Sequence, residues 1–348
     1  MLRPYAGAMV ELLAEAATAS ALRPYHIDEV KEAVFADAVE AKATSTQSLL
    51  LEGLHAAAYG GSAAGLGRRL WAEDGDVPLL SSEHLAAHIA AHFTAGNAVL
   101  AGTNVSHEAL VEAAGRHLGG LPSGAARQAT PAPAWRGGDH HLRARRGEGM
   151  ASLAMAFPAP PAGAGGRGAA AGHVLAALLG GTSHRGPWRA GLPGLSRLAR
   201  AGAAAGEGAV LRAFYLPGRD AGMLGVWGSL PAEGASPALL ELVAGSLRAL
   251  RGGAGIGAEE LARAKAGARL RAAVAGEERE SRRAALGAAA LATGSAGATL
   301  QQELSDIDKV SAGDVAALLA SALKAPPAVA AITGEDFPRY ESVKGLLA

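Results

Sequence analysis

Hydrophobic positions recur at helical spacing on both sides of a short apolar run within residues 80–121. The first helical face carries Leu85, Ile89, His92 and Phe93. Ser82 is its expected N-cap, and the apolar run 98–101 predicts a strand. The second helical face carries Leu110, Val111, Ala114 and Leu118. The pattern therefore predicts a helix, a strand and a helix, ended by Gly119-Gly120 and Pro122.

This pattern occurs twice in the chain. An offset of 230 positions aligns Ser81 with Ser311. The same offset aligns Leu85-Ala86-Ala87 with Val315-Ala316-Ala317, and residues 98–101 with residues 328–331. We interpret the match as an internal repeat and expect two equivalent halves. Only residues 1–79 precede the first copy, whereas residues from about 125 to 310 precede the second. Equivalent halves would leave about 100 residues missing ahead of the first copy, so we expect the chain to begin partway through its first domain.

Further helices are predicted ahead of the first copy. Met9, Leu12, Leu13 and Ala16 give an amphipathic helix that ends near Ser20. A longer helix opens at Arg23-Pro24, and its expected apolar face carries Ile27, Val30, Val34 and Ala38. Residues 46–59 predict a third helix, and residues 60–67 a loop.

Between the two copies, Pro and Gly in residues 125–138 indicate a linker. Residues 140–146 alternate as a basic edge strand, which we expect to present a solvated face, the alternative being a surface for an acidic partner. Residues 150–157 predict a strand that Pro158 stops. Two more strands, 210–215 and 221–229, flank a hairpin turn. Helices are expected at 169–179, 195–204, 236–250, 258–275 and 300–306, with a charged helical face at 277–283.

Helices interleaved with strand pairs indicate an α+β protein made of two α/β sandwiches with antiparallel-rich sheets. The expected domains are residues 1–124, which form the C-terminal part of a first domain, and residues 149–348, which form a second. Residues 125–148 are the expected linker between them.

Charge and composition narrow the possible partners. Lys plus Arg and Asp plus Glu both number 32, so the chain has no net positive charge that would favour binding to nucleic acid. The chain has no cysteine, which excludes disulfides, thiolate metal sites and cysteine nucleophiles. No apolar run is long enough to span a bilayer, and residues 1–17 resemble neither a secretory signal nor a transit peptide.

The histidines are the main candidates for chemistry. His84, His88 and His92 follow one helical stripe, but three imidazoles at this rise span about two turns, too long for one ion, and Glu83 points elsewhere. His107-Glu108 has Val111 where HExxH needs its second histidine. His55 is expected to be a packed or capping residue. We therefore predict no catalytic, cofactor-binding or metal-binding residue.

Three strings carry a family resemblance: residues 51–71 (LEGLHAAAYGGSAAGLGRRLW), residues 92–124 (HFTAGNAVLAGTNVSH and onward) and residues 291–315 (LATGSAGATLQQELSDIDKVSAGDV). They resemble the M16 metallopeptidase superfamily, and within it the core protein 2 subunits of cytochrome bc1 complexes. The resemblance implies tandem copies of one α/β domain, which accounts for the repeat.

The resemblance also implies where a zinc site would lie. Active members bind zinc through HxxEH and a downstream Glu, and no HxxEH occurs here. Ala38 stands where the downstream Glu is expected, although Asp37 and Glu40 lie close to that position. The glycine-rich loop of the processing peptidase alpha subunit would correspond to residues 180–194. That loop carries Arg185, Trp188 and Arg189 here and matches only loosely, which favours core protein 2.

By resemblance, then, the chain is expected to be a non-catalytic core subunit of ubiquinol–cytochrome c reductase on the matrix side of the mitochondrial inner membrane. The implied partners are a core-1-like M16 subunit, cytochrome b, cytochrome c1 and the Rieske protein. Such a subunit is peripheral to the membrane and holds no cofactor. The alternative is a processing-peptidase subunit that binds basic presequences.

Overall fold

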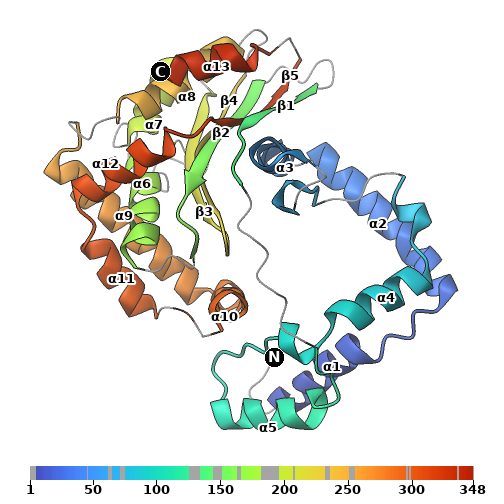
Figure 1. The fold of residues 1–348 in the computed structure, drawn as a ribbon. Helices are drawn as coiled ribbons and strands as arrows, with labels where there is room; N and C mark the ends of the chain where they lie inside the picture. Colours follow the sequence, from blue (N-terminus) through green and yellow to red (C-terminus); the bar gives the residue numbers. More distant parts are fainter. Residues whose placement is uncertain are drawn as a thin grey trace. The chain divides into compact units, whose positions relative to one another are not determined.

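The structure, a computed structural model, forms two compact units, each assembled from separate stretches of the chain (Figure 1). It describes residues 5–44, 46–61, 65–70, 75–124, 134–143, 151–162, 166–181, 196–206, 208–231, 236–250, 255–294, 297, 299–334 and 337–347. Unit 1 comprises Met1–Ala41, Trp71–Pro131 and Val274–Ala298. Unit 2 comprises Lys42–Leu70, Ala132–Ala273 and Thr299–Ala348. The expected domain limits at residues 124 and 149 stay predictions.

Unit 2 is built on a five-stranded sheet in the order β1-β5-β2-β4-β3. Its strands are β1 (Gly138–Arg143), β2 (Ala151–Ala159), β3 (Val210–Pro217), β4 (Gly222–Leu230) and β5 (Ala328–Thr333). β1 runs parallel to β5, and the three other pairings are antiparallel. The mixed α/β class and the antiparallel-rich sheet predicted from the sequence are therefore confirmed.

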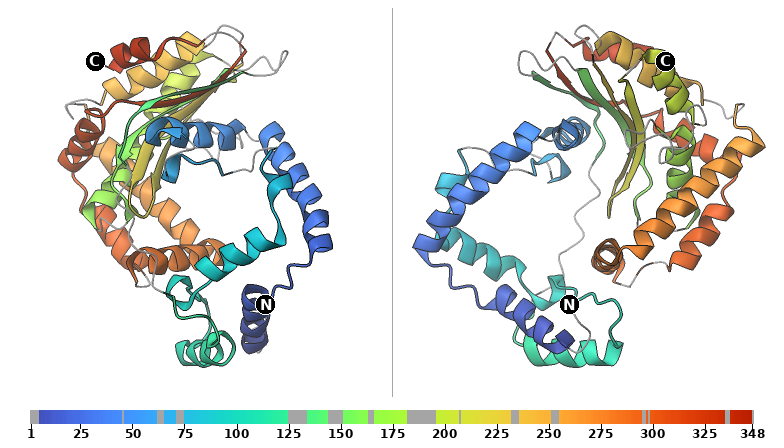
Figure 2. Two further views of the ribbon diagram at one scale, coloured as in Figure 1. Left: turned by 45° about the vertical axis from the view of Figure 1, so that its right-hand side comes forward. Right: turned by 180° about the vertical axis from the view of Figure 1, so that it is seen from behind.

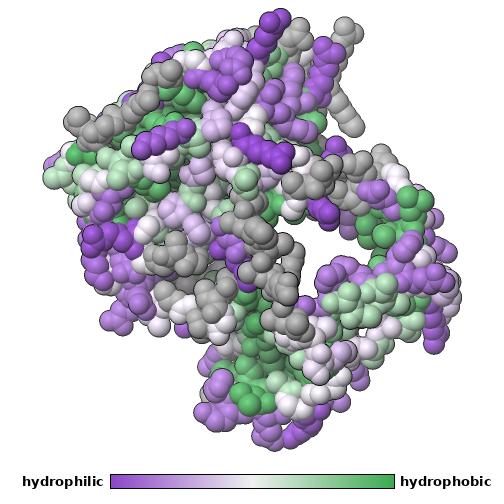
Figure 3. All heavy atoms as spheres, in the orientation of Figure 1, coloured by the Kyte–Doolittle hydropathy of each residue, from purple (hydrophilic) through white to green (hydrophobic). Residues whose placement is uncertain are grey.

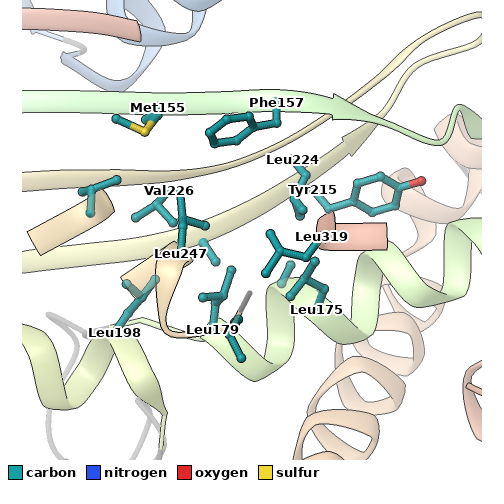
Figure 4. Close-up of a cluster of buried hydrophobic side chains, with 14 of the residues drawn as sticks. Met155, Phe157, Leu175, Leu179, Leu198, Tyr215, Leu224, Val226, Leu247 and Leu319 are labelled. Carbon is teal, nitrogen blue, oxygen red and sulfur yellow. The ribbon is translucent and has the colours of Figure 1, made fainter. Parts of the chain in front are cut away.

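One face of this sheet carries the larger core (Figure 4). Met155 and Phe157 of β2 and Leu224 and Val226 of β4 point towards the helices, as period-two alternation requires. The helices on this side are α6 (Arg167–Leu179), α7 (Arg197–Ala205), α8 (Ser236–Arg248), α9 (Ala258–Glu277), α11 (Leu300–Asp308), α12 (Ala312–Ala322) and α13 (Tyr340–Leu347). The helix α13 had no counterpart in the sequence prediction.

The opposite face of the sheet is covered by α3 (Thr46–Tyr59), whose bounds are those predicted (Figure 2). Leu50 and Leu54 are buried there against Ala154, Ala156 and Ala330. A Cβ on Gly53 would come within 2.9 Å of the His140 ring, so this glycine lets α3 approach the sheet closely.

Pro158 does not stop β2, contrary to the sequence prediction. The strand continues to Ala159, and Pro158 faces Met223 of β4 in the ladder. β5 pairs only with Ser152–Ala156, so Pro158 lies where β2 has a neighbour on one side alone. A proline without an N–H is tolerated at such an edge position.

Unit 1 consists mainly of helices. They are α1 (Ala6–Thr18), most of α2 (Pro24–Thr44), α4 (Ser82–His92), α5 (His107–Leu118) and α10 (Arg279–Thr293), with short 3-10 turns η4 (Val77–Leu79) and η5 (Ala95–Asn97). A third such turn, η3 (Gly65–Gly67), belongs to unit 2. Among the described residues, no helix is both long and apolar enough to cross a membrane.

The repeat is visible in the helices. α4 (Ser82–His92) and α12 (Ala312–Ala322) have the same length at the predicted offset, and each begins after a serine N-cap. The cap of α4 is Ser81, which accepts from the backbone N–H of His84, and not the predicted Ser82. Ser311 plays the same part in α12.

The strands of the repeat differ. Residues 328–331 lie in β5, whereas residues 98–101 belong to no strand, so the strand predicted in the first copy is wrong. A strand needs a neighbour for its backbone hydrogen bonds, and the described residues of unit 1 include no strand that offers one.

Candidate interaction surface

An apolar groove lies within unit 1 and has a volume of about 390 Å³. α2 contributes Ile27, Val30 and Val34 to one wall. Val77 and Leu80 of the segment before α4, together with Leu85 of α4, form the other. Ser20, Ala21 and Leu22 of the connection between α1 and α2 complete the lining. The volume lies within the range of ligand pockets, about 300–1,000 Å³.

The connection between α1 and α2 bends sharply beside this groove. Leu22 has a φ of +43°, in the left-handed region that a branched side chain rarely adopts. The next residue, Arg23, offers its carbonyl to the backbone N–H groups of His26 and Ile27 at 3.0 and 3.1 Å. These two bonds begin α2 and fix the direction in which it leaves the bend.

The ionisable side chains that line the groove are all basic: Arg23, His26 and Lys31. Arg23 donates to the hydroxyl of Tyr25 at 2.8 Å. Lys31 pairs with Asp28 at 3.2 Å and also reaches the Pro78 carbonyl at 3.5 Å, which ties α2 to η4. The groove thus combines an apolar lining with a basic rim, on which Asp28 neutralises Lys31, and matches an apolar or weakly acidic occupant.

Apolar side chains of α1 also remain exposed. Val10 and Ala14 are the buried residues of this helix, and it packs against α5. Met9, Leu12 and Leu13, predicted to form its inner face, are exposed. Hydrophobic side chains reach the surface in this region (Figure 3).

The predicted inner face of α2 is exposed in the same way. Val30 and Val34 are 56% and 42% exposed, and Phe35 beside them is 41% exposed. Contiguous exposed apolar surface of this kind marks contact sites. We therefore take α1, α2 and the groove together as the candidate interaction surface of unit 1.

The histidines of α4 lie together on the surface of unit 1. His84, His88 and His92 are all exposed, and the rings of His88 and His92 lie 4.6 Å apart between centroids. In the described part of the chain, no group of three or more His, Cys, Asp or Glu side chains is placed to hold a metal ion. Ala91 stands between His88 and His92 where HxxEH has its glutamate, so this pair does not complete that motif.

The two other histidine candidates have structural positions. His107 begins α5 next to its N-cap Ser106, and Ser106 Oγ donates to Glu108 Oε2 at 2.7 Å. This hydrogen bond is the main cause that lowers the pKa of Glu108. His55 lies on α3, with Nδ1 2.9 Å from the Leu51 carbonyl oxygen and its ring against that of Tyr59. His55 thus has a packed position, one of the two roles expected for it.

The position expected for a zinc-binding glutamate lies on α2. Asp37 is exposed there, and the side chains of Ala38 and Glu40 lie outside the described residues. Residues 182–194 of the glycine-rich loop, including Arg185, Trp188 and Arg189, also lie outside them. The absence of catalytic residues therefore stays a prediction from the sequence.

The basic segment 140–146 forms edge strand β1 as far as Arg143, and its remainder lies outside the described residues. Its alternation is as predicted, but one face is not solvated. His140 packs beside Gly53 of α3, and burial lowers the pKa of this histidine. His141 on the other face contacts Thr333 Oγ1 at 2.7 Å through Nε2.

Sequence reasoning missed the groove and one ionic clasp. In the clasp, Arg197 of α7 meets both carboxylate oxygens of Glu260 on α9 at 2.8 Å and also donates to the Ala249 and Gly255 carbonyls. Arg197 and Glu260 lie 63 positions apart in the sequence, so no local sequence pattern indicates this ion pair. The groove was missed because the apolar periodicity of α2 predicts a buried face whether or not a neighbour exists to cover it.

Comparison with known families identifies the chain's relatives. The family model described as the Peptidase M16 inactive domain matches residues 80–268, more than half of the chain. The chain belongs to this family. The resemblance to M16 proteins is therefore confirmed, and the family supports a chain that is non-catalytic by itself.

Mitochondrial-processing peptidase alpha subunits are similar in sequence. The subunit from Solanum tuberosum is 32% identical over 199 residues, 57% of this chain and 38% of that protein. A probable chloroplastic/mitochondrial alpha-2 subunit from Arabidopsis thaliana is 31% identical over 159 residues, 46% of this chain and 30% of its own length. The chain thus spans less than two fifths of these relatives.

Among solved structures, a chain of complex III2 from Candida albicans with Inz-5 bound has the same fold. The TM-score is 0.84 at 17% sequence identity, and the match covers 100% of this chain and 82% of the other. At this identity the likeness concerns the fold alone.

Proposed function

We propose that the chain is a non-catalytic structural core subunit of the mitochondrial ubiquinol–cytochrome c reductase, respiratory complex III, and supports its assembly and stability. The observation that carries the proposal is the fold, which follows a complex III chain over the full length of this one. Membership of the inactive M16 family agrees with a supporting role.

The proposed partners are a core-1-like M16 subunit together with cytochrome b, cytochrome c1 and the Rieske protein. The proposed location is the matrix side of the mitochondrial inner membrane, peripheral to the bilayer. The exposed apolar faces of α1 and α2 and the groove between α2 and α4 support a role in assembly, because a contact between subunits would remove that surface from water.

A second candidate is a non-catalytic, alpha-like subunit of the mitochondrial processing peptidase that binds presequences. Its support is the sequence identity to the potato alpha subunit. The groove argues against it, since Arg23 on its rim has the same charge sign as a basic presequence and its lining includes no acidic side chain among the described residues. Like charges at a contact cost affinity.

Affinity purification of the tagged protein from mitochondria tests the proposal, with mass spectrometry and absorption spectra for b- and c-type haem as the readouts. We expect cytochrome b, cytochrome c1 and the Rieske protein to co-purify with haem. Recovery of one M16 partner that carries HxxEH, without haem, would overturn the proposal in favour of the processing peptidase.

A further inference from the structure

Three basic side chains of unit 2 come from elements that meet beside the outer strand of its sheet (Figure 1). They are His173 of α6, Arg212 of β3 and Arg271 of α9. α6 packs closely on β3, since a Cβ on Gly172 would come within 2.7 Å of the Tyr215 ring. Gly181, just after α6, forms a bridge with Arg212. These two contacts lay α6 along β3 from Tyr215 to Arg212.

α9 lies against another side of α6. A Cβ on Gly267 would be 3.9 Å from the Cβ of Ala177, so these residues mark where the two helices face each other. Arg271 and His173 each lie one turn away from that point, on the facing sides. Burial and then the charge of Arg271 lower the pKa of His173, and burial and then the charge of Arg212 lower the pKa of Arg271. The three basic groups therefore act on one another.

No carboxylate offsets these charges among the described residues. Within that part of the chain, neither Arg212 nor Arg271 forms a side-chain ion pair or hydrogen bond, and no acidic group shifts the pKa of His173. Arg263 and Arg269, on the same helix as Arg271, both pair with carboxylates. Like charges without a counter-ion destabilise a fold, and natural proteins keep such local conflicts mainly at functional sites.

The cluster is open to solvent but stands on rigid elements. Arg212 and Arg271 are exposed, and His173 is half-buried with its ring edge-on to that of Tyr215, 4.9 Å away between centroids. β3 pairs with β4 along its whole length, and α6 is packed into the larger core. A ligand can therefore reach these side chains, and the backbone that carries them is already ordered, which lowers the entropic cost of binding.

We propose that His173, Arg212 and Arg271 form a binding site for a phosphate group. Two guanidinium groups carry two positive charges, which match a phosphate dianion, whereas a single carboxylate would leave one charge without a partner. Burial disfavours the charged form of His173, so its neutral ring donates one N–H to the ligand. Free phosphate, a nucleotide and a phospholipid headgroup all offer this chemistry. The site goes beyond the proposed role in an assembly and does not depend on it.

Thermal unfolding and calorimetric titration of the purified chain with inorganic phosphate test the site, with chloride at equal ionic strength as the reference. Phosphate is expected to raise the unfolding midpoint of the parent. Arg271→Gln is expected to weaken binding about tenfold or more, because a charge-assisted hydrogen bond is lost. Arg263→Gln, two turns away on α9, is the matched control and is expected to bind as the parent does. An equal response of R271Q and the parent would mean an adventitious ion only and would overturn the proposal.

Stability without phosphate separates a binding site from a structural role. In phosphate-free buffer, R271Q is expected to unfold at the same urea concentration as the parent or at a higher one, because the substitution removes the repulsion between Arg271 and Arg212. Arg212→Gln is expected to behave in the same way and to lose phosphate binding as well. A lower midpoint for both variants would mean that the arginines stabilise the fold by their own contacts, which overturns the assignment.

Three probes distinguish the possible sources of the phosphate group: inorganic phosphate, ATP, and vesicles that contain phosphatidylglycerol, with pure phosphatidylcholine vesicles as the reference. Binding to the phosphatidylglycerol vesicles that R271Q loses would identify a lipid headgroup. Binding of phosphate or ATP without binding to vesicles would identify a free anion. Binding of none of the three overturns the proposal. The co-purification experiment with haem is unaffected by these results, so the proposed function stands or falls separately.

Discussion

The hydroxyl of Tyr215 donates to the Pro160 carbonyl at 2.6 Å and ties β3 to the end of β2. Its ring packs edge-on against His173 of α6, with centroids 4.9 Å apart. Tyr215→Phe keeps the ring and removes the hydrogen bond, so we expect a loss of about 1 kcal/mol in the free energy of unfolding. Urea unfolding checks this value, with Tyr5→Phe on the exposed ring of Tyr5 as the control.

The same tyrosine predicts an alkaline limit of stability. Burial raises the pKa of Tyr215 from 10.0 to about 12. The folded state therefore binds this proton more tightly than the unfolded state, and the resulting stabilisation is present below pH 10 and lost as the pH rises towards about 12. Between pH 10 and about 12, the free energy of unfolding is expected to fall more steeply with pH in the parent than in Y215F. Equal slopes would contradict the assignment.

The ion pair between Arg197 and Glu260 gives a second prediction about single residues. Both side chains are about 15% exposed, and removing one partner leaves the other without its charge partner. Arg197→Ala is expected to cost about 2 kcal/mol. A double-mutant cycle with Glu260→Gln measures the coupling, and the i,i+4 surface pair Glu112–Arg116 provides a control expected to couple by about 0.5 kcal/mol or less.

The acid dependence of the clasp has a definite sign. The hydrogen bond from Arg197 is the main cause that lowers the pKa of Glu260 below 4.5. The stabilisation is therefore present above pH 4.5 and is lost as the pH falls through the lower pKa of the folded state. The E260Q variant is expected to lack this part of the acid dependence.

Helix capping can be compared directly between the two copies of the repeat. Ser311 and Asp314 form a reciprocal capping box at the start of α12, whereas Ser81 caps α4 through one bond to the His84 N–H. Ser311→Ala is expected to destabilise unit 2 by about 1 kcal/mol, because α12 is packed into the core. Ser81→Ala is expected to speed exchange at the start of α4 and to leave unit 2 unchanged. Hydrogen exchange of α4 and α12 in the two variants checks both expectations.

Sequence patterns predicted those elements whose environment is local. The bounds of α3, the hairpin of β3 and β4 and the repeat offset of α4 and α12 all follow from periodicity, caps and turn residues. The strand at 98–101 was wrong because a strand depends on a neighbour that the pattern does not contain. The exposed faces of α1 and α2 were missed for the same reason, and so was the groove that Val30 and Val34 line.

At the scale of the whole molecule, the two units bury very different amounts of apolar surface. Unit 2 encloses a continuous core from Leu153 on β2 to Leu319 on α12. The buried apolar residues of unit 1 among those described are few and small: Val10, Ala14, Val77 and Ala113. Since burial of apolar area supplies most of the folding free energy, unit 1 is expected to be the less stable of the two.

This difference predicts unfolding that is not two-state. Trp135 and Trp227 belong to unit 2 and pack against the apolar cluster between α3 and the sheet. In a variant that carries Trp71→Phe and Trp188→Phe, these are the two tryptophans that remain, so the fluorescence reports on unit 2 alone. Circular dichroism reports on helices of both units. In urea, the dichroism of the purified chain is expected to fall before the fluorescence changes. In the native assembly the early step is expected to move to higher urea, because a partner that covers the exposed apolar faces of α1 and α2 adds its binding free energy to unit 1. Coincident curves for the purified chain would mean that unit 1 is as stable alone as unit 2, and its exposed apolar faces would then need no partner.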